Sequence, residues 1–191
     1  MINYPIKRKI QTKTTNYANL GMTLESDIEA SNLFYLNHDI AVIHKKPTPI
    51  QVVSVSYPAR NKAKITEAYY KTPSTTDFNG IFKGHYIDFD AKETNSKTSM
   101  PLKNVHPHQI DHLKQVTKQG GIAFLIVHFK VYNEYYLLPA NILFTFWDEQ
   151  HEEKGRKSIP YDTFKTSCHQ VPFGYQPRLD YLKVVEKYLL T

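Results

Sequence analysis

The sequence predicts an α/β protein in which helices flank a mixed β-sheet. Residues 85–92 alternate between polar and apolar side chains, which is the pattern of a strand. Residues 121–128 form an almost unbroken apolar run, as expected of a strand buried on both faces. Strand-like and helical segments then follow in the order strand, strand, helix, strand, strand, helix, which favours a mixed sheet with helices on its faces.

The N-terminal part divides into a basic arm, a helix and a short strand. Residues 1–20 carry Lys7, Arg8, Lys9 and Lys13 with little apolar periodicity, so we expect a flexible arm. A DNA-contacting role and a simple free terminus both remain open for this arm. Thr23 is a suitable N-cap for a helix over residues 23–36, and residues 39–44 resemble a short strand.

Residues 44–72 are predicted to form a hairpin-like excursion. Pro47 and Pro49 break regular structure near its start. Residues 51–57 alternate like a strand, residues 58–64 form a basic turn, and residues 65–70 fit either a second strand or a short helix. The excursion contains only one acidic residue, Glu67, but six basic residues: Lys45, Lys46, Arg60, Lys62, Lys64 and Lys71.

The centre of the chain predicts a hairpin. Asn79-Gly80 lies between two β-like runs, which is a strong signal for a tight turn. Because side chains alternate along a strand, one face of the following strand takes Tyr86, Asp88, Asp90 and Lys92. Ile87, Phe89 and Ala91 take the other face, so this strand is expected to be half-buried.

The C-terminal half alternates helices and strands. Pro107 starts a helix that runs to about Gln119 and is capped by Gly120. Strands follow at residues 121–128 and 134–138, and helices at residues 141–147 and 179–190. Residues 21–191 therefore constitute one domain, with the excursion as an insertion.

Composition excludes several classes of protein. The chain of 191 residues is 41% hydrophobic, so it is not disordered as a whole. Its one cysteine, Cys168, excludes an internal disulfide and favours a reducing compartment. The longest apolar run, residues 122–127, is far too short to span a membrane, and the N-terminus lacks the apolar stretch of a signal peptide. The net charge of +6 favours an acidic partner.

Asp77, Asp90 and Lys92 are the residues most suited to chemistry. The predicted hairpin places Asp77 and Asp90 on neighbouring strands, and Lys92 shares the face of Asp90. Two carboxylates suit a hard cation such as Mg²⁺ or Mn²⁺, and a nearby lysine can hold water or offset charge on a phosphate. A solvated strand face would show the same spacing. The apolar neighbours and the basic excursion upstream favour the nuclease interpretation.

The same residues resemble a known family. The segments Gly21–Ile28, His44–Pro49, Ser74–Gly80, Tyr86–Thr94 and Pro177–Tyr181 are similar, in this order, to those of RecU, a Holliday-junction resolvase of Gram-positive bacteria and their phages. The resemblance implies a restriction-endonuclease-like core, of the PD-(D/E)xK type, with a stalk formed by residues 44–70. It also implies a cytoplasmic, nucleoid-associated homodimer that nicks four-way DNA junctions symmetrically with Mg²⁺, or alternatively Mn²⁺.

Site residues follow from the resemblance by position. Thr75, Asp77, Asp90 and Gln109 would be metal-site residues, and Lys92 would stabilise the transition state. DNA contacts would come from Lys45, Lys46, Arg60, Lys62, Lys64, Tyr69 and Thr76. One departure stands out: the family usually has Glu where this chain has Asp90. The shorter side chain retracts its carboxylate by roughly 1–1.5 Å, which is large against Mg²⁺–oxygen distances of about 2.0–2.1 Å.

Other residues have two interpretations. Glu25 fits a metal-assisting acid or, more simply, a solvated helix face. Tyr69 and Tyr70 could stack on exposed bases or pack under the stalk. His108 and His112 have zinc-like spacing, but an oxygen-rich site argues against zinc. Cys168 has no partner for nucleophilic catalysis, and His85 is expected at the surface. Trp147 and residues 132–136 are expected in the core or at a dimer interface.

Two alternatives to a resolvase stay open. A chain weakened by Asp90 could act as a junction-binding scaffold for recombinase and branch-migration proteins. A restriction-type enzyme on the same core could instead cut linear duplexes, which would require side chains that read bases in a groove.

Overall fold

The computed structural model describes residues 23–59, 62–71 and 75–190. The predicted N-terminal arm over residues 1–20 and the predicted DNA contact Arg60 lie outside these residues. No helix in the described part of the chain is long and apolar enough to cross a bilayer.

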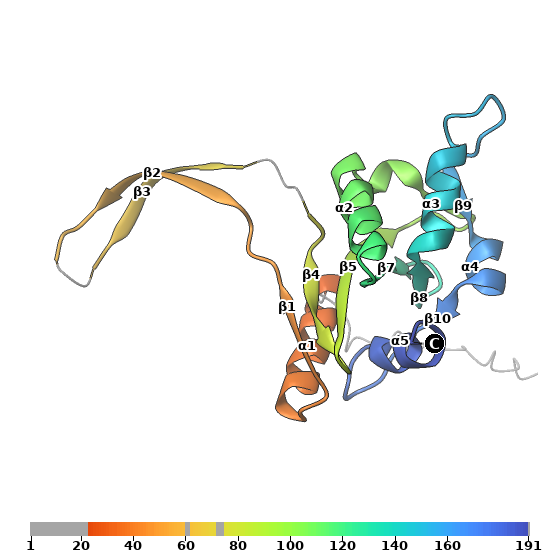
Figure 1. Cartoon of the computed structure of the whole chain (residues 1–191), viewed down its shortest axis with the longest axis horizontal. Helices are drawn as coiled ribbons and strands as arrows, with labels where there is room; N and C mark the ends of the chain where they lie inside the picture. The colour runs from red at the N-terminus through yellow and green to blue at the C-terminus, as the bar shows by residue number, and fades with distance from the viewer. Residues whose placement is uncertain (1–22, 60–61, 72–74, 191) are drawn as a thin grey trace, which may run out of the picture.

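Helices and strands alternate along the chain (Figure 1). The helices are α1 (Leu24–Asn37), α2 (Pro107–Lys118), α3 (Ala140–Glu149), α4 (Tyr161–Ser167) and α5 (Tyr181–Tyr188). The strands are β1 (Ala41–Lys45), β2 (Ile50–Ser56), β3 (Lys64–Tyr70), β4 (Phe78–Phe82), β5 (His85–Thr94), β6 (Ser99–Pro101), β7 (Ile122–Phe129), β8 (Glu134–Pro139), β9 (Ser158–Pro160) and β10 (His169–Gln170).

The main sheet is mixed, as predicted. Its six strands have the order β1-β4-β5-β7-β8-β10. β5 and β7 run parallel, whereas the other neighbouring pairs are antiparallel. Helix α2 connects the two parallel strands, as such a crossover requires.

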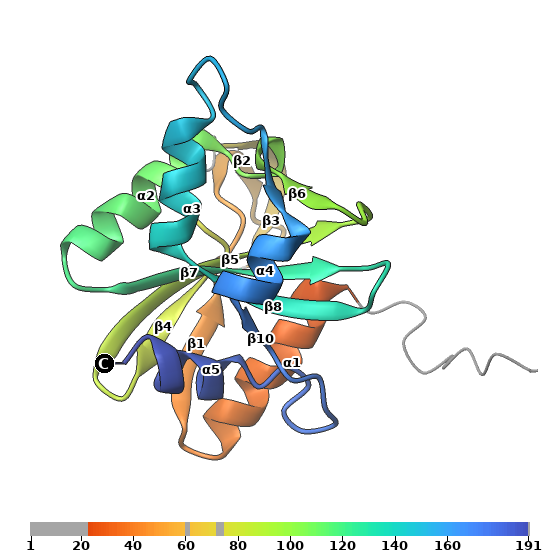
Figure 2. The ribbon, with the colours of Figure 1, turned by 90° about the vertical axis from the view of Figure 1, so that its right-hand side faces the viewer.

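Helices cover both faces of this sheet (Figure 2). One core lies between the sheet and helices α1 and α5, and includes Ile28, Phe89 and Val185. A second core lies on the opposite face under α2, α3 and α4, and includes Leu113 and Leu143. The central strands β5 and β7 are therefore covered on both sides. Strand β5 is buried on both faces over residues 87–90, so the expectation of a half-buried strand was wrong for its middle.

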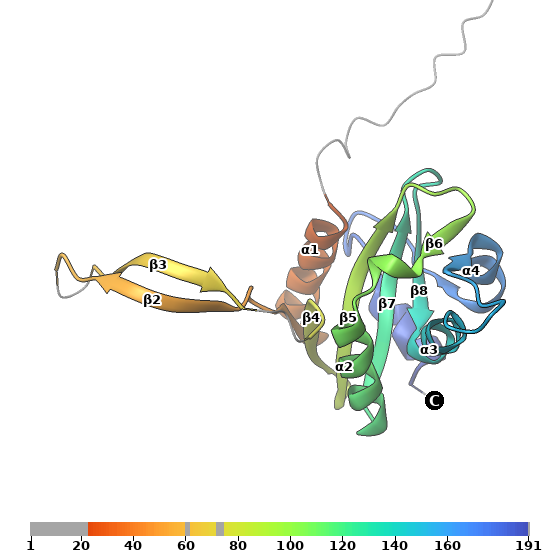
Figure 3. The ribbon, with the colours of Figure 1, turned by 90° about the horizontal axis from the view of Figure 1, so that it is seen from above.

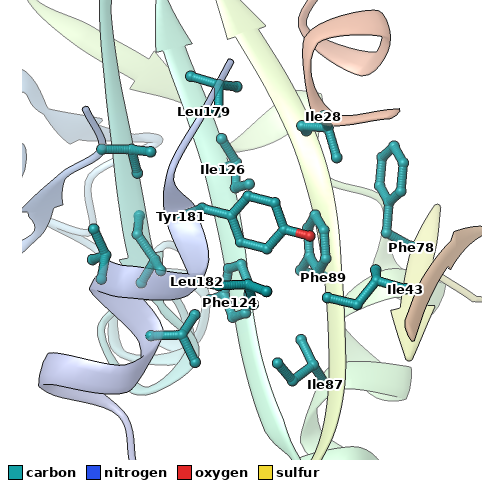
Figure 4. Close-up of a cluster of buried hydrophobic side chains, with 14 of the residues drawn as sticks. Ile28, Ile43, Phe78, Ile87, Phe89, Phe124, Ile126, Leu179, Tyr181 and Leu182 are labelled. Carbon is teal, nitrogen blue, oxygen red and sulfur yellow. The ribbon is translucent and has the colours of Figure 1, made fainter. Parts of the chain in front are cut away.

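Three stacked phenylalanines fix the central strands to one another. Phe78 on β4 stacks on Phe89 of β5 at 5.0 Å between ring centroids, and Phe89 stacks on Phe124 of β7 at 4.7 Å. Tyr181 of α5 lies against this row from the side of the helices (Figure 4). Cross-strand aromatic pairs of this kind stabilise strand register. The row holds β4 and β5 in the register that places Phe78 opposite Phe89.

The predicted excursion contains a separate two-stranded sheet of β2 and β3, which projects from the body (Figures 1 and 3). The resemblance implies a stalk over residues 44–70; from here on, the word stalk means residues 46–76, which connect β1 to β4. Of the two interpretations of residues 65–70, the strand is confirmed. Near the body, the pairs Ile50–Tyr70 and Val52–Ala68 lie on one face of the stalk. Both strands are exposed along nearly their whole length.

The central hairpin exists, but its predicted turn was wrong. Asn79 and Gly80 lie inside β4, and the turn consists of Lys83 and Gly84. Both turn residues have positive φ, at 50° and 79°, which is the requirement of a type I′ turn. Gly80 serves another purpose: β1 passes so close that a Cβ at Gly80 would lie 2.0 Å from the Val42 carbonyl oxygen.

Most other elements match their predictions within a few residues. Thr23 caps α1 by accepting a hydrogen bond from the Ser26 backbone N–H, and Gly120 follows α2 with a φ of 83°. The last helix is shorter than predicted, since α5 covers only Tyr181–Tyr188. Helix α4 and strands β6, β9 and β10 were not predicted. They are two to seven residues long, too short for a hydrophobic period to mark them.

We predict that Gly80→Ala destabilises the fold by about 2 kcal/mol, because the added methyl group must push β1 away from β4. Gly84→Asn is the control, since Gly84 has open space around its Cβ position and asparagine tolerates positive φ. Urea denaturation of both variants measures the effect. A loss at Gly80→Ala no larger than that at Gly84→Asn would contradict this account of the β1–β4 contact.

Candidate active site

Asp77 and Asp90 meet at the predicted place, although the hairpin turn differs. β4 begins at Phe78, which pairs with Phe89, so Asp77 and Asp90 are the next pair of neighbours across these two strands. Asp77 lies near enough to Asp90 to raise the pKa of that carboxyl group. The stacked phenylalanines on the opposite face of the sheet hold this alignment.

Asp90 is fully buried and held from two sides. The side-chain amide of Gln109 donates a hydrogen bond to Asp90 Oδ2. Gln109 Oε1 in turn accepts the His106 backbone N–H at 3.1 Å, so the start of α2 fixes the amide. Lys92 Nζ lies 3.0 Å from Asp90 Oδ1. Oδ1 is nevertheless buried without a well-formed hydrogen bond from the described residues.

The environment of Asp90 favours its protonated form. Burial raises the pKa of Asp90, the charge of Lys92 lowers it, and the neighbouring Asp77 raises it again; the result is a pKa of about 7. Burial of Asp90 beside a second, half-buried acid, Asp77, therefore opposes ionisation of Asp90 more than Lys92 favours it. A divalent cation would remove this conflict.

Asp88 shares the face of Asp90 but lies in a different environment. Asp88 Oδ2 accepts hydrogen bonds from Lys46 Nζ at 2.9 Å, from His112 Nε2 at 2.9 Å and from the Tyr86 hydroxyl at 2.7 Å. Asp88 Oδ1 accepts one from the Thr76 hydroxyl. Burial tends to raise the pKa of Asp88, but the hydrogen bonds from Thr76, His112, Lys46 and Tyr86 hold it below its ordinary value.

Three predicted site residues are turned inward. Thr76 is 2% exposed, so the predicted DNA contact at Thr76 does not face solvent. Lys46 directs its ammonium group to Asp88 and Thr76, not outward as a phosphate contact would require. Thr75 is half-buried beside Asp77, and its hydroxyl donates to the Thr76 carbonyl oxygen at 3.3 Å.

A groove at the base of the stalk opens beside these residues. Its lining includes Glu25, Lys45, Pro47, Thr75 and Asp77. Lys45 Nζ lies 2.7 Å from Glu25 and 2.9 Å from Glu29, both on α1. The predicted phosphate contact of Lys45 therefore competes with two carboxylates, and Glu25 is an ion-pair partner at the edge of the site.

The remaining predicted DNA contacts lie on the stalk. Lys62, Lys64, Tyr69 and Tyr70 are exposed, and the last three belong to strand β3, which projects from the body (Figure 1). The Tyr69 hydroxyl donates to Glu67 at 2.8 Å, so the two side chains share a face. Tyr70 is 84% exposed and is not packed under the stalk.

The structure also shows the surroundings of His108, His85, Trp147 and Cys168, which the sequence left with two interpretations or assigned to the core or surface. His108 is half-buried at the start of α2 and within electrostatic range of Lys92 and Asp77, and His85 is exposed, as expected. Trp147 packs against the second core. Cys168 is buried, and burial raises the pKa of its thiol to about 12, so a reactive thiolate is disfavoured.

The donor set fits a magnesium-like cation better than a transition metal. Among the described residues, no group of three or more His, Cys, Asp or Glu side chains could hold an ion. Mg²⁺ is usually bound by one or two carboxylates plus water and substrate phosphate, which is what Asp77 and Asp90 provide. Asp90 Oδ1 is the buried carboxylate oxygen of the described residues that lacks a hydrogen-bond partner, with the Lys92 ammonium group 3.0 Å away.

The family relation follows from sequence comparison. The model of the RecU family, described as recombination protein U, matches residues 19–187. The chain belongs to the RecU family. The match includes the stalk and every RecU site residue inferred from the resemblance.

Close RecU relatives are named Holliday junction resolvase RecU. The protein from Geobacillus sp. (strain WCH70) is 56% identical over 182 residues, covering 95% of this chain and 90% of the relative. That of Staphylococcus aureus (strain JH9) is 52% identical over 184 residues, covering 96% and 88%. A solved structure of Archaeoglobus fulgidus Hjc, a Holliday junction resolvase, matches with a TM-score of 0.34 and 9% identity over 53% of this chain and 75% of Hjc. That partial match adds nothing to the RecU relation.

Sequence reasoning missed the network around Asp88. The alternation of β5 placed Asp88 on the correct face but did not identify its partners, since Lys46 and His112 are 42 and 24 residues away. Glu29 was also missed as a partner of Lys45. A buried strand with two carboxylates on one face was the available signal, because each buried carboxylate requires a partner.

We predict that Asp90 makes the metal-free protein less stable as pH rises. Between its ordinary pKa of 3.8 and its folded pKa of about 7, the folded protein keeps a proton that the unfolded chain releases. The free energy of unfolding therefore falls with rising pH in this window. In EDTA, the free energy of unfolding of Asp90→Asn should exceed that of the wild type by on the order of 2 kcal/mol at pH 8. The difference should be much smaller near pH 4, and urea denaturation at both pH values measures it. An equal difference at both pH values would show that Asp90 is ionised throughout.

Proposed function

We propose that this chain resolves Holliday junctions as a metal-dependent endonuclease that nicks two opposed strands. The observation that carries the proposal is the position of Asp77, directly after the Phe78–Phe89 pair, next to the buried Asp90 and Lys92. Asp77 also lines the groove at the base of the projecting stalk. Proteins more than 50% identical over nearly the whole chain carry the name Holliday junction resolvase RecU.

Asp77 and Asp90 would hold the divalent cation, and Thr75 and Gln109 would complete or orient the ligand set. When bound, Mg²⁺ or Mn²⁺ supplies polarisation of the scissile phosphate and acidification of water. Gln109 keeps Asp90 Oδ2 in place, which leaves Oδ1 facing Lys92. The shorter Asp90 thus receives its position from β5 and α2 together.

Lys92 is placed to act on the reacting phosphate. Its side chain is 12% exposed, and its ammonium group lies 3.0 Å from Asp90 Oδ1. A cation in such a water-poor place interacts strongly with charge that develops on a phosphate in the transition state. Lys92 would therefore offset this charge or orient the attacking water.

The stalk would enter the open centre of the junction. Lys62 and Lys64 lie at its tip, where they can contact phosphates, and Arg60 is expected to add to them. Tyr69, on the face of the stalk opposite Ile50 and Val52, is an exposed aromatic side chain that can stack on unpaired bases. Lys45 would contribute at the base once DNA phosphate competes with Glu25 and Glu29. The chain would work at the nucleoid, with recombinase and branch-migration proteins as neighbours.

A homodimer would give the two symmetric cuts. A two-fold dimer presents identical sites to a junction of matching symmetry. An isolated two-stranded hairpin is marginally stable in water, yet Ile50, Val52 and Tyr70 are exposed on one face of the stalk. Packing of this face on a second copy would bury these side chains.

The first test is cleavage of a labelled mobile four-way junction and of a linear duplex of the same sequence, with Mg²⁺, Mn²⁺ or EDTA. We expect paired nicks in the junction alone, lost in EDTA. Asp77→Asn should reduce cleavage at least a hundredfold because the cation loses a ligand, while junction affinity stays within about threefold.

Other outcomes identify the rival functions. Tight junction binding without nicks under either metal would make the chain a binding scaffold. Linear duplex cut as readily as the junction would make it a restriction-type enzyme. Retained cleavage by Asp77→Asn would remove Asp77 from the site.

The second test concerns the dimer. Sedimentation should give roughly twice the chain mass of 22.2 kDa. Val52→Asp should shift the protein towards monomers, because it places a charge on the apolar face of the stalk. Gln51→Glu adds a charge to the opposite face and should leave the dimer intact. A dimer unaffected by Val52→Asp would place the interface elsewhere.

A further inference from the structure

The two ends of the stalk meet on one buried carboxylate. Lys46 stands where the chain leaves β1 for the stalk, and Thr76 stands where it returns to β4. Both side chains donate to Asp88 on β5, Lys46 at 2.9 Å, and Lys46 Nζ also donates to Thr76 Oγ1 at 2.9 Å. Asp88 therefore joins the entry and the exit of the stalk to the strand that carries Asp90.

The same carboxylate also reaches helix α2. His112 Nε2 donates to Asp88 Oδ2 at 2.9 Å, and His112 lies one helical turn after Gln109, which holds Asp90. On the stalk side, the Lys46 backbone N–H donates to the Asp77 carbonyl oxygen at 2.7 Å. Lys46, a partner of Asp88, is therefore bonded to the backbone of Asp77, and His112, another partner, lies one turn from the residue that holds Asp90.

Asp88 is suited to a rigid connection and not to ligand binding. It is fully buried, and both of its oxygens accept hydrogen bonds from protein groups. A carboxylate with this many donors leaves little room for a cation. Hydrogen bonds in a low-dielectric interior, above all the one from the Lys46 ammonium group, are strong and directional, so displacement of one element shifts the elements bonded to it.

We propose that Asp88 is a positioning residue that couples the stalk to the active site. Asp88, Lys46, Thr76 and His112 form a clamp that sets Asp77 against Asp90 according to how the stalk is held. Junction DNA that orients the stalk thereby orients the metal-site carboxylates, which makes the clamp a determinant of junction selectivity. This inference rests on the proposed function.

The test compares Asp88→Asn with two further variants. Asp88→Asn keeps the shape of the side chain but places an amide N–H among donors. Thr76→Val removes one stalk-side donor and serves where Asp88→Asn fails to fold. Tyr86→Phe is the matched control, because it removes a hydrogen bond to Asp88 that comes from neither the stalk nor α2.

Two readouts separate coupling from general stability. Single-turnover cleavage of pre-bound junction in saturating Mg²⁺ should fall at least tenfold for Asp88→Asn and measurably for Thr76→Val, while junction affinity in EDTA stays within about twofold for both. Hydrogen exchange, which needs no activity, should show faster exchange of the Lys46 amide in both variants. Tyr86→Phe should resemble the wild type in each assay.

Three other outcomes would contradict the coupling by Asp88 or the proposed function. Wild-type cleavage by Asp88→Asn with an unchanged Lys46 amide would overturn the clamp. Parallel loss of junction affinity and cleavage, together with faster exchange throughout the fold, would show that Asp88 only stabilises the protein. Absence of junction cleavage by the wild type would instead reject the proposed function, and the Lys46 exchange would still report on the clamp.

Discussion

The structure depends on the burial of two carboxylates in strand β5, which is covered on both faces at this point. Burying a charged group costs free energy unless other groups compensate it. Every neighbouring element is arranged around this requirement. Helix α2 brings Gln109 and His112, the ends of the stalk bring Lys46 and Thr76, and β4 brings Asp77.

The two carboxylates are compensated in opposite ways. Asp88 accepts hydrogen bonds on both oxygens, and these hold its pKa below the ordinary value although it is buried. Burial raises the pKa of Asp90 to about 7, with a further contribution from the neighbouring Asp77, although Lys92 lowers it. The first arrangement satisfies the buried carboxylate with protein donors alone, whereas the second leaves Asp90 Oδ1 without a hydrogen-bond partner among the described residues. Asp88 and Asp90, two residues apart on the same face of β5, thus differ in how their buried carboxyl groups are compensated.

The opposite face of the sheet makes this separation possible. Phe78, Phe89 and Phe124 stack across three strands and fix their register without contacting the polar face. Since successive side chains alternate across a strand, a shift by one residue would move the carboxylates into the apolar core. The aromatic row therefore determines which acids meet, and the close approach at Gly80 keeps the edge strand in place.

The mixed α/β fold, the stalk and the pair Asp77 and Asp90 could be predicted from the amino-acid sequence, because each is marked by local periodicity or by family motifs that lie within short segments. The hairpin turn was misplaced, since Asn-Gly satisfies the same local preference as Lys83-Gly84 and only packing against β1 distinguishes them. The buried groups that compensate each carboxylate depend on contacts between distant parts of the chain and could not be predicted from local patterns. Asp88 and Asp90 are alike in sequence context, and their different roles arise from partners up to 42 residues away that chain folding brings within 3 Å.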